Sequence, residues 1–412
     1  MLDIKFVREN PDVVRAAAKN KNSDPNKVDE AIKLDGMRRH LLIEVEDLRA
    51  KRNQLTREDI AEGKKLKNLL KDLEPKLNDV EDQLNLVMRQ IPNIPFDDIP
   101  IGKDESENVV TREWGAPRKF DFAPKDHVEL GEQLGVINIE AAGKVAGARF
   151  GYFMGDLALM EIALVQYAFQ KLVKKGFVPV IPPVMIKPEV FVRMARLDPG
   201  QEEERYFMPK DNLYLVGSAE HTLGPIHMDE TLEEKHLPKR YVGFSTCFRR
   251  EAGSYGKDVR GMLRVHQFDK VEMESFTVAE ESRNEQDFLI SIQEEMMQDL
   301  NLPYQVIAIC TGDMGGPDAR QVDINTWMPA QNKYRETQTA DLMTDYQARR
   351  LNTRVRRSNG SLELAHMNDA TCIAIGRTMI AILENYQNKN GSVTIPEVLR
   401  PYMGKDTIQP LG

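Results

Sequence analysis

Cysteine and histidine are scarce in this sequence, which limits the chemistry that it can hold. The 412 residues include three cysteines and seven histidines. The cysteines (Cys247, Cys310 and Cys372) are odd in number, far apart and without paired spacing, so we expect reduced, buried thiols of a cytosolic protein. The histidines are scattered and form no zinc-ligand pattern with the cysteines. We therefore expect neither a disulfide framework nor a zinc site.

Long apolar runs are also absent. No apolar stretch approaches the roughly 18 residues that a membrane-spanning helix needs, and the N-terminal MLDIKFVREN lacks the apolar core of a signal peptide. We expect a cytoplasmic protein with no membrane partner. The net charge of −9 argues against a protein that grips phosphates over its whole surface. Any contact with RNA therefore has to use local basic patches.

Rossmann and P-loop fingerprints are missing too, so a nucleotide has to be bound in another way. Short strand-like segments alternate with loops instead, at 214–216, 241–248, 263–268 and 304–308. Hairpin-type connections between such segments predict an antiparallel sheet. A long amphipathic run at 156–175, ended by Gly176, predicts a helix that leads into a strand at 178–181.

The N-terminal quarter has a different pattern. Apolar residues from Leu66 to Ile91 are spaced 4-3-4-3-4-3-4, which predicts the seam of a coiled coil: Leu66, Leu70, Leu73, Leu77, Val80, Leu84, Val87 and Ile91. A similar alternation upstream has Arg52 in one seam position. Two antiparallel helices with a turn at 61–63 follow from this pattern, and Pro75 predicts a kink in the second helix.

Charge indicates a use for this helical arm. Between Arg49 and Lys71 there are eight Lys and Arg residues and three acidic residues, a net charge of +5. A coiled coil that serves only for dimerisation would mix the two signs evenly. A basic tip suits the phosphate backbone of RNA better.

A chain of this length is expected to form two domains. The segment IPNIPFDDIPIG, residues 91–102, contains three prolines and reads as a stiff, extended linker. We place the boundary after residue 95, which gives domains of 1–95 and 96–412. The predicted class is α+β, with a coiled-coil arm and a body built on an antiparallel sheet flanked by helices.

The most informative segment is FRREAGSYGKDVRGMLRVHQFDKVE, residues 248–272. It predicts two strands joined by a long, glycine-rich and charged loop, which we expect to be mobile. A solvated hairpin with ion pairs would explain the charges, but so would a site that holds a polyanion by its charge. His266 is expected to be structural, because a histidine within a strand is more often hydrogen-bonded than catalytic.

This segment resembles the second signature motif of class II aminoacyl-tRNA synthetases, in the form found in seryl-tRNA synthetases. The resemblance extends from MLDIKFVRENPDVV to PYMGK near the C-terminus. It implies a cytoplasmic homodimer, with the interface built by 156–183, and an arm that contacts tRNA(Ser). The candidate tRNA-binding residues are Arg49, Arg52, Arg57, Lys64, Lys65 and Lys67.

The resemblance also implies roles in ATP binding. Arg249 is expected to bridge the α-phosphate of ATP and the carboxylate of serine, and Arg377, on a helix expected at 372–386, to meet the γ-phosphate; these two are the candidate catalytic residues. Because 372–386 is otherwise apolar, we expect Arg377 to be a lone buried guanidinium, which is costly unless a bound anion pairs with it. Glu251 should accept from the adenine amino group, Phe268 should stack on the ring, and Arg264 completes the ATP set.

Magnesium and serine complete the implied site. Glu336 and Thr339 are the expected Mg²⁺ ligands, with Glu336 also counted in the ATP site. The expected serine-binding residues are Ser218, Glu220, Arg249, Glu272 and Thr371.

The amino-acid pocket departs from the family pattern. Where the family has Thr-x-Glu, this sequence has Ser218-Ala219-Glu220. Where the family has a Ser-Ser-Cys-Ser-Asn run, it has Gln338-Thr339-Ala340-Asp341, and where the family has an asparagine, it has Asp369. The alternatives are a catalytically silent paralogue that binds RNA, a paralogue that charges a carrier protein, and an enzyme that activates another amino acid. The retained site residues argue against the first and the basic arm against the second, so altered specificity is the most serious rival.

Overall fold

The computed structural model describes residues 1–56, 59–252 and 261–411 and divides into two units, Met1–Pro95 and Phe96–Gly412. The first unit is helical and the second combines helices with a large sheet, as the α+β prediction requires. Arg57 and most of the 253–261 loop fall outside the described residues. Among the described helices, none is both long enough and apolar enough to cross a bilayer.

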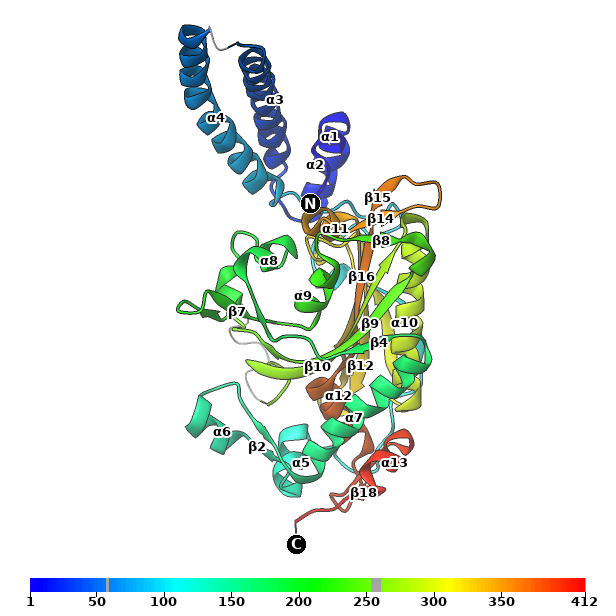
Figure 1. The fold of residues 1–412 in the computed structure, drawn as a ribbon. Helices are drawn as coiled ribbons and strands as arrows, with labels where there is room; N and C mark the ends of the chain where they lie inside the picture. Colours follow the sequence, from blue (N-terminus) through cyan, green and yellow to red (C-terminus); the bar gives the residue numbers. More distant parts are fainter. Residues whose placement is uncertain (57–58, 253–260, 412) are drawn as a thin grey trace. The chain divides into compact units, whose positions relative to one another are not determined.

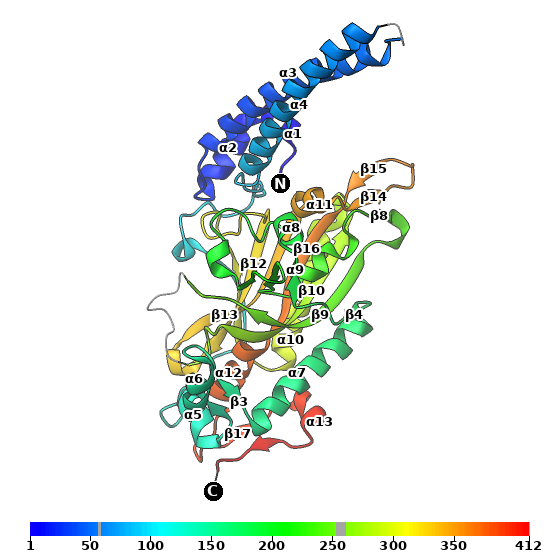
Figure 2. The same ribbon diagram turned by 60° about the vertical axis from the view of Figure 1, so that its left-hand side comes forward.

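Four helices form the N-terminal unit: α1 (Ile4–Glu9), α2 (Pro11–Asn20), α3 (Asn26–Asn53) and α4 (Ile60–Met88). Both views show α3 and α4 running side by side (Figures 1 and 2). The α4 seam is buried at every predicted position except Leu73, which is half-buried, and it packs against Val45 of α3. The predicted coiled coil is therefore confirmed.

The predicted turn at 61–63 is wrong, because these residues lie inside α4. The connection comes earlier, after α3 ends at Asn53. There Asp59 Oδ2 accepts hydrogen bonds from both the backbone N–H and the hydroxyl of Thr56, at 2.8 and 2.7 Å. These bonds close a turn next to the first residue of α4, so side-chain hydrogen bonding, and not Gly63, sets the break.

A buried carboxylate fixes the base of this unit. Asp35 is fully buried, and its carboxylate accepts hydrogen bonds from the guanidinium groups of Arg8, Arg38 and Arg39 at 2.7, 2.9 and 3.1 Å. Burial would raise the pKa of Asp35, but the hydrogen bonds from Arg38 and Arg8 outweigh it and hold the pKa below 3.8. The carboxylate therefore contributes stability above pH 3.8, and this contribution is lost as the pH falls through the lowered pKa.

We expect Asp35→Asn to destabilise the helical unit by about 2 kcal/mol, because three arginines lose their shared anion. Hydrogen exchange of α1 and α3 in the full chain measures this, and the difference from the unchanged protein should shrink as the pH falls through the lowered pKa of Asp35. Asp29→Asn is the control, since its carboxylate is exposed and pairs only at the surface with Arg15. Equal protection in both variants would contradict the prediction.

The second unit is built on an eight-stranded sheet in the order β1-β11-β12-β13-β16-β10-β9-β4. Its strands are β1 (Val109–Trp114), β4 (Val178–Val180), β9 (Lys239–Phe248), β10 (Gln267–Thr277), β11 (Tyr304–Ala308), β12 (Arg320–Met328), β13 (Lys333–Thr344) and β16 (His366–Ala374). All neighbours pair antiparallel except β4 and β9. The predicted antiparallel sheet is confirmed.

Shorter elements surround this sheet. The helices are α5 (His127–Leu134), α6 (Ile139–Ala146), α8 (Pro188–Arg193), α9 (Glu220–Leu223), α11 (Tyr346–Leu351) and α13 (Arg400–Met403). The strands are β2 (Ile137–Asn138), β3 (Tyr152–Phe153), β5 (Met185–Ile186), β6 (Phe207–Met208), β7 (Leu213–Leu215), β8 (Thr231–Glu233), β14 (Arg354–Arg356), β15 (Leu362–Leu364), β17 (Val393–Thr394) and β18 (Thr407–Ile408).

One face of the sheet packs against the helical core, and the other carries polar side chains. Apolar strand residues such as Met273, Ala340 and Cys372 pack into one core with α7 (Gly155–Lys174), α10 (Ser282–Asp299) and α12 (Ile375–Tyr386). Figure 1 shows α10 on one side of the sheet and α8 and α9 on the other. Because successive strand side chains point to opposite faces, the residues between the apolar ones are presented to the side of α9. The three cysteines are buried and form no disulfide bond with one another, as expected.

Three predicted boundaries need correction. The strand expected at 263–268 begins only at Gln267, because its partner β9 ends at Phe248, opposite Gln267. The helix expected at 372–386 begins at Ile375, since 372–374 complete β16. The linker 91–102 is not extended throughout: the amide of Phe96 donates to Ala319 O, and Ile99 is buried against Ile307 and Ile309.

Candidate active site

The candidate site lies on the sheet face opposite the helical core. Glu272 and Glu274 of β10 alternate with buried Val271 and Met273, and β16 and β13 show the same alternation. Strand register places Thr371 opposite Glu272 and Asp369 opposite Glu274. Residues far apart in the chain therefore meet because the strands bring polar side chains to one face.

A first cavity, of about 110 Å³, collects the predicted nucleotide-binding residues. It is lined by Arg249, Glu251, Arg264, Phe268, Glu336, Thr339, Thr371 and Arg377. The Arg249 guanidinium lies 5.3 Å from the centre of the Phe268 ring, and its Nε donates to Gly217 O at 3.1 Å. These contacts hold a cation and an aromatic face in one cavity, which suits a phosphate and a base.

The end of β9 is fixed by backbone hydrogen bonds. The amide of Arg249 donates to His266 O at 3.0 Å, and the His266 ring nitrogen Nδ1 lies 3.0 Å from Arg249 O. His266 thus contacts the end of β9 through its backbone and its ring, but it lies just before β10 and not within a strand as predicted. Two residues on, Glu251 has φ +52°, in the left-handed region that few residues other than glycine adopt. Its carboxylate pairs with Arg264 at 3.4 Å.

Glu336 and Arg377 form an ion pair at 2.9 Å at the far end of this cavity. Arg377 is half-buried and already has this anion, so the expectation of a buried guanidinium without a protein partner is wrong. Desolvation would raise the pKa of Glu336, but Arg377, Arg249 and Arg264 outweigh it and lower the pKa. An ionised carboxylate therefore stands in the same cavity as the Thr339 hydroxyl.

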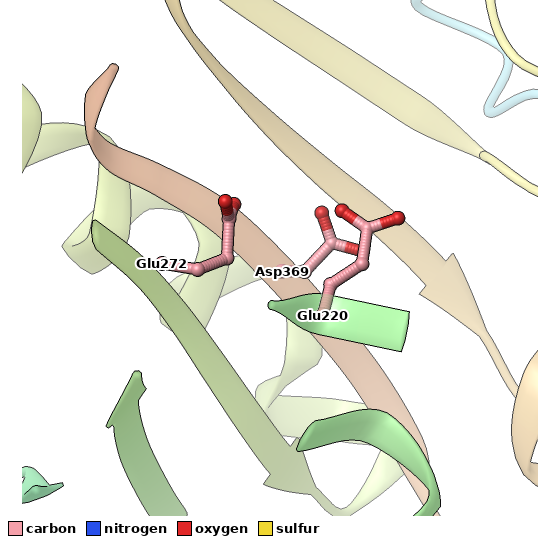
Figure 3. A group of neighbouring side chains, drawn as sticks. All are labelled: Glu220, Glu272 and Asp369. Carbon is pink, nitrogen blue, oxygen red and sulfur yellow. The ribbon is translucent and has the colours of Figure 1, made fainter. Parts of the chain in front are cut away.

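A second cavity, of about 490 Å³, shares Arg249, Lys270 and Thr339 with the first and contains Glu220 and Asp341. Figure 3 shows Glu272 and Asp369 on neighbouring strands and Glu220 on the short helix α9. One carboxylate oxygen of each lies within 4.8 Å of the others. Such a group attracts a cation, either a metal ion or an ammonium group.

Hydroxyl groups and a lysine surround these carboxylates. The Ser218 hydroxyl lies 3.3 Å from both Glu220 Oε2 and Glu272 Oε2, and the Thr371 hydroxyl donates to Glu272 Oε1 at 3.2 Å. Lys270 Nζ pairs with Glu272 at 2.5 Å. Of the five predicted serine-binding residues, Glu220, Arg249 and Thr371 line the cavities, and Ser218 and Glu272 are buried directly behind them. Burial raises the pKa of Glu272 although Lys270 opposes this.

Sequence reasoning missed Lys270 and Arg196. Lys270 is two residues before Glu272 on the same strand, so strict alternation would have found it. Arg196 lies in the loop after α8 and pairs with Glu220 at 2.8 Å. Burial would raise the pKa of Glu220, but Arg196, together with His221, Lys270 and Arg249, outweighs it and lowers the pKa. No local pattern in the sequence predicts a role for this arginine.

The sheet and site define the core of a class II aminoacyl-tRNA synthetase. Residues 206–386 match the tRNA synthetase class II core domain (G, H, P, S and T), and residues 1–95 match the seryl-tRNA synthetase N-terminal domain. The serine--tRNA ligases of Fervidobacterium nodosum and Acidothermus cellulolyticus are 42% and 43% identical to this chain, with 100% of both chains covered in each comparison. The chain belongs to the seryl-tRNA synthetase family.

A solved structure supports the same assignment. The crystal structure of seryl-tRNA synthetase from Pyrococcus horikoshii complexed with ATP superposes on this chain with a TM-score of 0.94. The two sequences are 37% identical, and 100% of each chain is covered. The likeness therefore includes the arm as well as the body.

Proposed function

We propose that this chain is a cytoplasmic, ATP-dependent ligase that activates L-serine as seryl-adenylate and transfers it to tRNA(Ser). The observation that carries the proposal is the meeting of two cavities at Arg249. One holds an aromatic ring and cations suited to a nucleotide, and the other holds carboxylates and hydroxyls suited to an amino acid. A site that joins two substrates needs such a shared wall.

ATP binds at the first cavity and extends into a larger adjoining one, which shares Arg264, Glu336 and Arg377 with it. Phe268 stacks on the adenine, Glu251 accepts from its amino group, and Arg249, Arg264 and Arg377 bind the phosphates. Serine binds where the second cavity meets the first, between Glu220 of the second and Thr371 of the first. Glu220 and Glu272 receive the α-ammonium group, and the hydroxyls of Ser218 and Thr371 lie near the substrate side chain. Both substrates then present their reacting groups to Arg249.

Adenylate formation needs positioning and charge neutralisation. An oxygen of the serine carboxylate attacks the α-phosphorus, a new P–O bond forms, and the bond to the bridging oxygen breaks so that pyrophosphate leaves. Arg249 neutralises charge that develops on the α-phosphate and aligns the attacking carboxylate. The carboxylate is already ionised at neutral pH, so this step requires no general base.

Mg²⁺ fits the residues at the phosphate end of the first cavity. Glu336 has a lowered pKa and an exposed carboxylate, the Thr339 hydroxyl lines the same cavity, and Asp323 Oδ1 close by is buried without a hydrogen-bond partner among the described residues. Oxygen donors of this kind suit a hard cation. When bound, the ion would offset negative charge on the phosphate groups.

We expect Glu336→Gln to raise the Mg²⁺ concentration for half-maximal pyrophosphate exchange by about tenfold, because the amide removes a charged ligand. Titration of exchange activity with Mg²⁺ at saturating serine measures this. Glu363→Gln, an exposed change on β15, is the control. An unchanged Mg²⁺ requirement in Glu336→Gln would remove this residue from the ligand set.

The arm and the dimer complete the proposal. The exposed lysines Lys64, Lys65 and Lys67 of α4 contact the tRNA backbone, which explains the excess of positive charge near the turn.

Leu159 and Ile162 of α7 are exposed apolar side chains, which supports a homodimer interface on this helix. Measurement of mass in solution tests the dimer.

Amino-acid-dependent ATP–pyrophosphate exchange, run without tRNA over the twenty amino acids, tests the central claim. Exchange with serine alone is the expected result. Exchange with a different amino acid would favour the second candidate function, an altered specificity to which Asp341 and Asp369 point. No exchange with any amino acid would overturn the enzyme and leave an RNA-binding role.

A further inference from the structure

Three carboxyl groups form a row across the sheet, which begins at Asp341 in the wall of the second cavity and continues beneath the surface. Asp341 of β13 is opposite Asp369 of β16, which is opposite Glu274 of β10. All three are buried. Cross-strand neighbours share one face of a sheet and lie close together, so ionising all three would place like charges side by side.

The protein environment opposes such a concentration of negative charge. Burial raises the pKa of Asp369 and of Glu274 well above their ordinary values, and the neighbouring acids raise them further. Neither oxygen of Glu274 and only one oxygen of Asp369 has a hydrogen-bond partner among the described residues. The row therefore favours any cation that reaches it.

Arg196 reaches this row from the loop after α8. Its Nη2 lies 3.5 Å from Asp369 Oδ2 and 3.9 Å from Asp341 Oδ2, and its Nε lies 2.8 Å from Glu220 Oε1. Only 16% of its side chain is exposed. One guanidinium thus connects this row with the carboxylate expected to receive the substrate ammonium.

This placement has two consequences for a bound amino acid. Arg196 helps to keep Glu220 ionised, so Glu220 can pair with the α-ammonium group. It also provides the positive charge beside Asp341 and Asp369. A neutral hydroxyl on the substrate side chain can bind beside Arg196. An ammonium group on the substrate side chain would instead be repelled by the Arg196 guanidinium, which already pairs with these acids.

We propose that Arg196 is a specificity-determining residue, which orients Glu220 toward the substrate ammonium and excludes amino acids that carry an amine in place of the serine hydroxyl. The inference deepens the proposed function and rests on it. The amine analogue that matches serine in size is 2,3-diaminopropionate, so discrimination between these two amino acids measures the effect directly.

The test compares pyrophosphate exchange with serine and with 2,3-diaminopropionate in the full-length protein. We expect Arg196→Met to raise the KM for serine by about tenfold or more, with a smaller change in kcat, and to lower the ratio of kcat/KM for serine over diaminopropionate by at least about tenfold. Arg196→Lys should lie between Arg196→Met and the unchanged protein, because it keeps the charge but not the planar fork.

A charge-balanced variant keeps the test valid if Arg196→Met does not fold. Arg196→Met combined with Asp341→Asn and Asp369→Asn removes the cation and the acids together, so diaminopropionate should again be refused. Arg193→Met is the matched control, since Arg193 pairs with Asp229 outside the cavity. Circular dichroism checks the fold of each variant.

Two results would overturn the proposal. The first is an unchanged ratio of serine to diaminopropionate in folded Arg196→Met, whatever the KM for serine. The second is activation of diaminopropionate by the charge-balanced variant at the level of Arg196→Met. Failure of the unchanged protein to use serine would instead contradict the proposed function, so the two failures can be told apart.

Discussion

Arg249→Lys should reduce serine-dependent pyrophosphate exchange by about 10²–10³-fold, mainly through kcat. Lysine keeps the charge but loses the planar pair of donors that can bridge a phosphate and a carboxylate. It also loses the Nε–H that donates to Gly217 O at 3.1 Å, so the remaining ammonium is less well positioned. Steady-state exchange kinetics, with ATP and serine varied in turn, measure the effect.

Arg250→Lys provides the matched control for this prediction. Arg250 is the next residue and lies over the Tyr206 ring, but it lines neither of the two cavities. Its replacement should leave exchange within about twofold of the unchanged protein. A loss of similar size in both variants would mean that the local backbone, and not the Arg249 guanidinium, is responsible.

Reversing the charge of the arm should separate tRNA binding from amino-acid activation. We expect the triple change of Lys64, Lys65 and Lys67 to glutamate to raise the KM for tRNA(Ser) by about 10²-fold and to flatten the salt dependence of binding, since phosphate contacts are lost. Exchange without tRNA should not change, because these exposed residues belong to the helical unit. Aminoacylation and exchange are measured on the same preparation.

Three exposed lysines of the other unit serve as the control for the arm. The same change at Lys119, Lys144 and Lys174 alters the net charge equally but leaves the arm intact. If both triple variants lost tRNA binding to the same extent, general electrostatic attraction would explain the result. A normal KM for tRNA in the arm variant would contradict the role of the basic tip.

Long periodic patterns in the sequence predict the fold well, whereas a single residue that often breaks helices predicts it poorly. The heptad seam of α4 runs for more than three heptads, so chance placement of its leucines is improbable and burial followed the pattern. The segment 61–63 suggests a turn because it ends in glycine, which often ends helices. A helix tolerates one glycine at modest cost, and the bonds between Thr56 and Asp59 had already fixed the turn.

Alternation identified buried residues but not strand pairing. Leu263 and Val265 are both buried, as a strand pattern implies, yet they precede β10. A strand requires a neighbour that supplies hydrogen bonds, and the chain beyond Phe248 turns at Glu251 instead of continuing the ladder. Pairing depends on the path of a distant segment, which local sequence does not record.

The site shows the same limit. Most candidate residues came from the resemblance and lie together around the two cavities. Arg196 could not be anticipated, because its partners Glu220, Asp341 and Asp369 are distant in sequence and its own loop has no periodicity. Long-range ion pairs of this kind become visible only when the strands are in register.

The two-sided character of the sheet also has an evolutionary consequence. Side chains of β10, β13 and β16 that face the helices maintain folding, whereas their immediate neighbours in sequence face the side of the two cavities. Substitutions at every second position can therefore change ligand preference while the hydrophobic packing stays intact. A single-residue insertion in these strands would exchange the two sets and damage both. Lineages of this enzyme are thus free to diverge by replacement within the pocket strands, but hardly by changing their length.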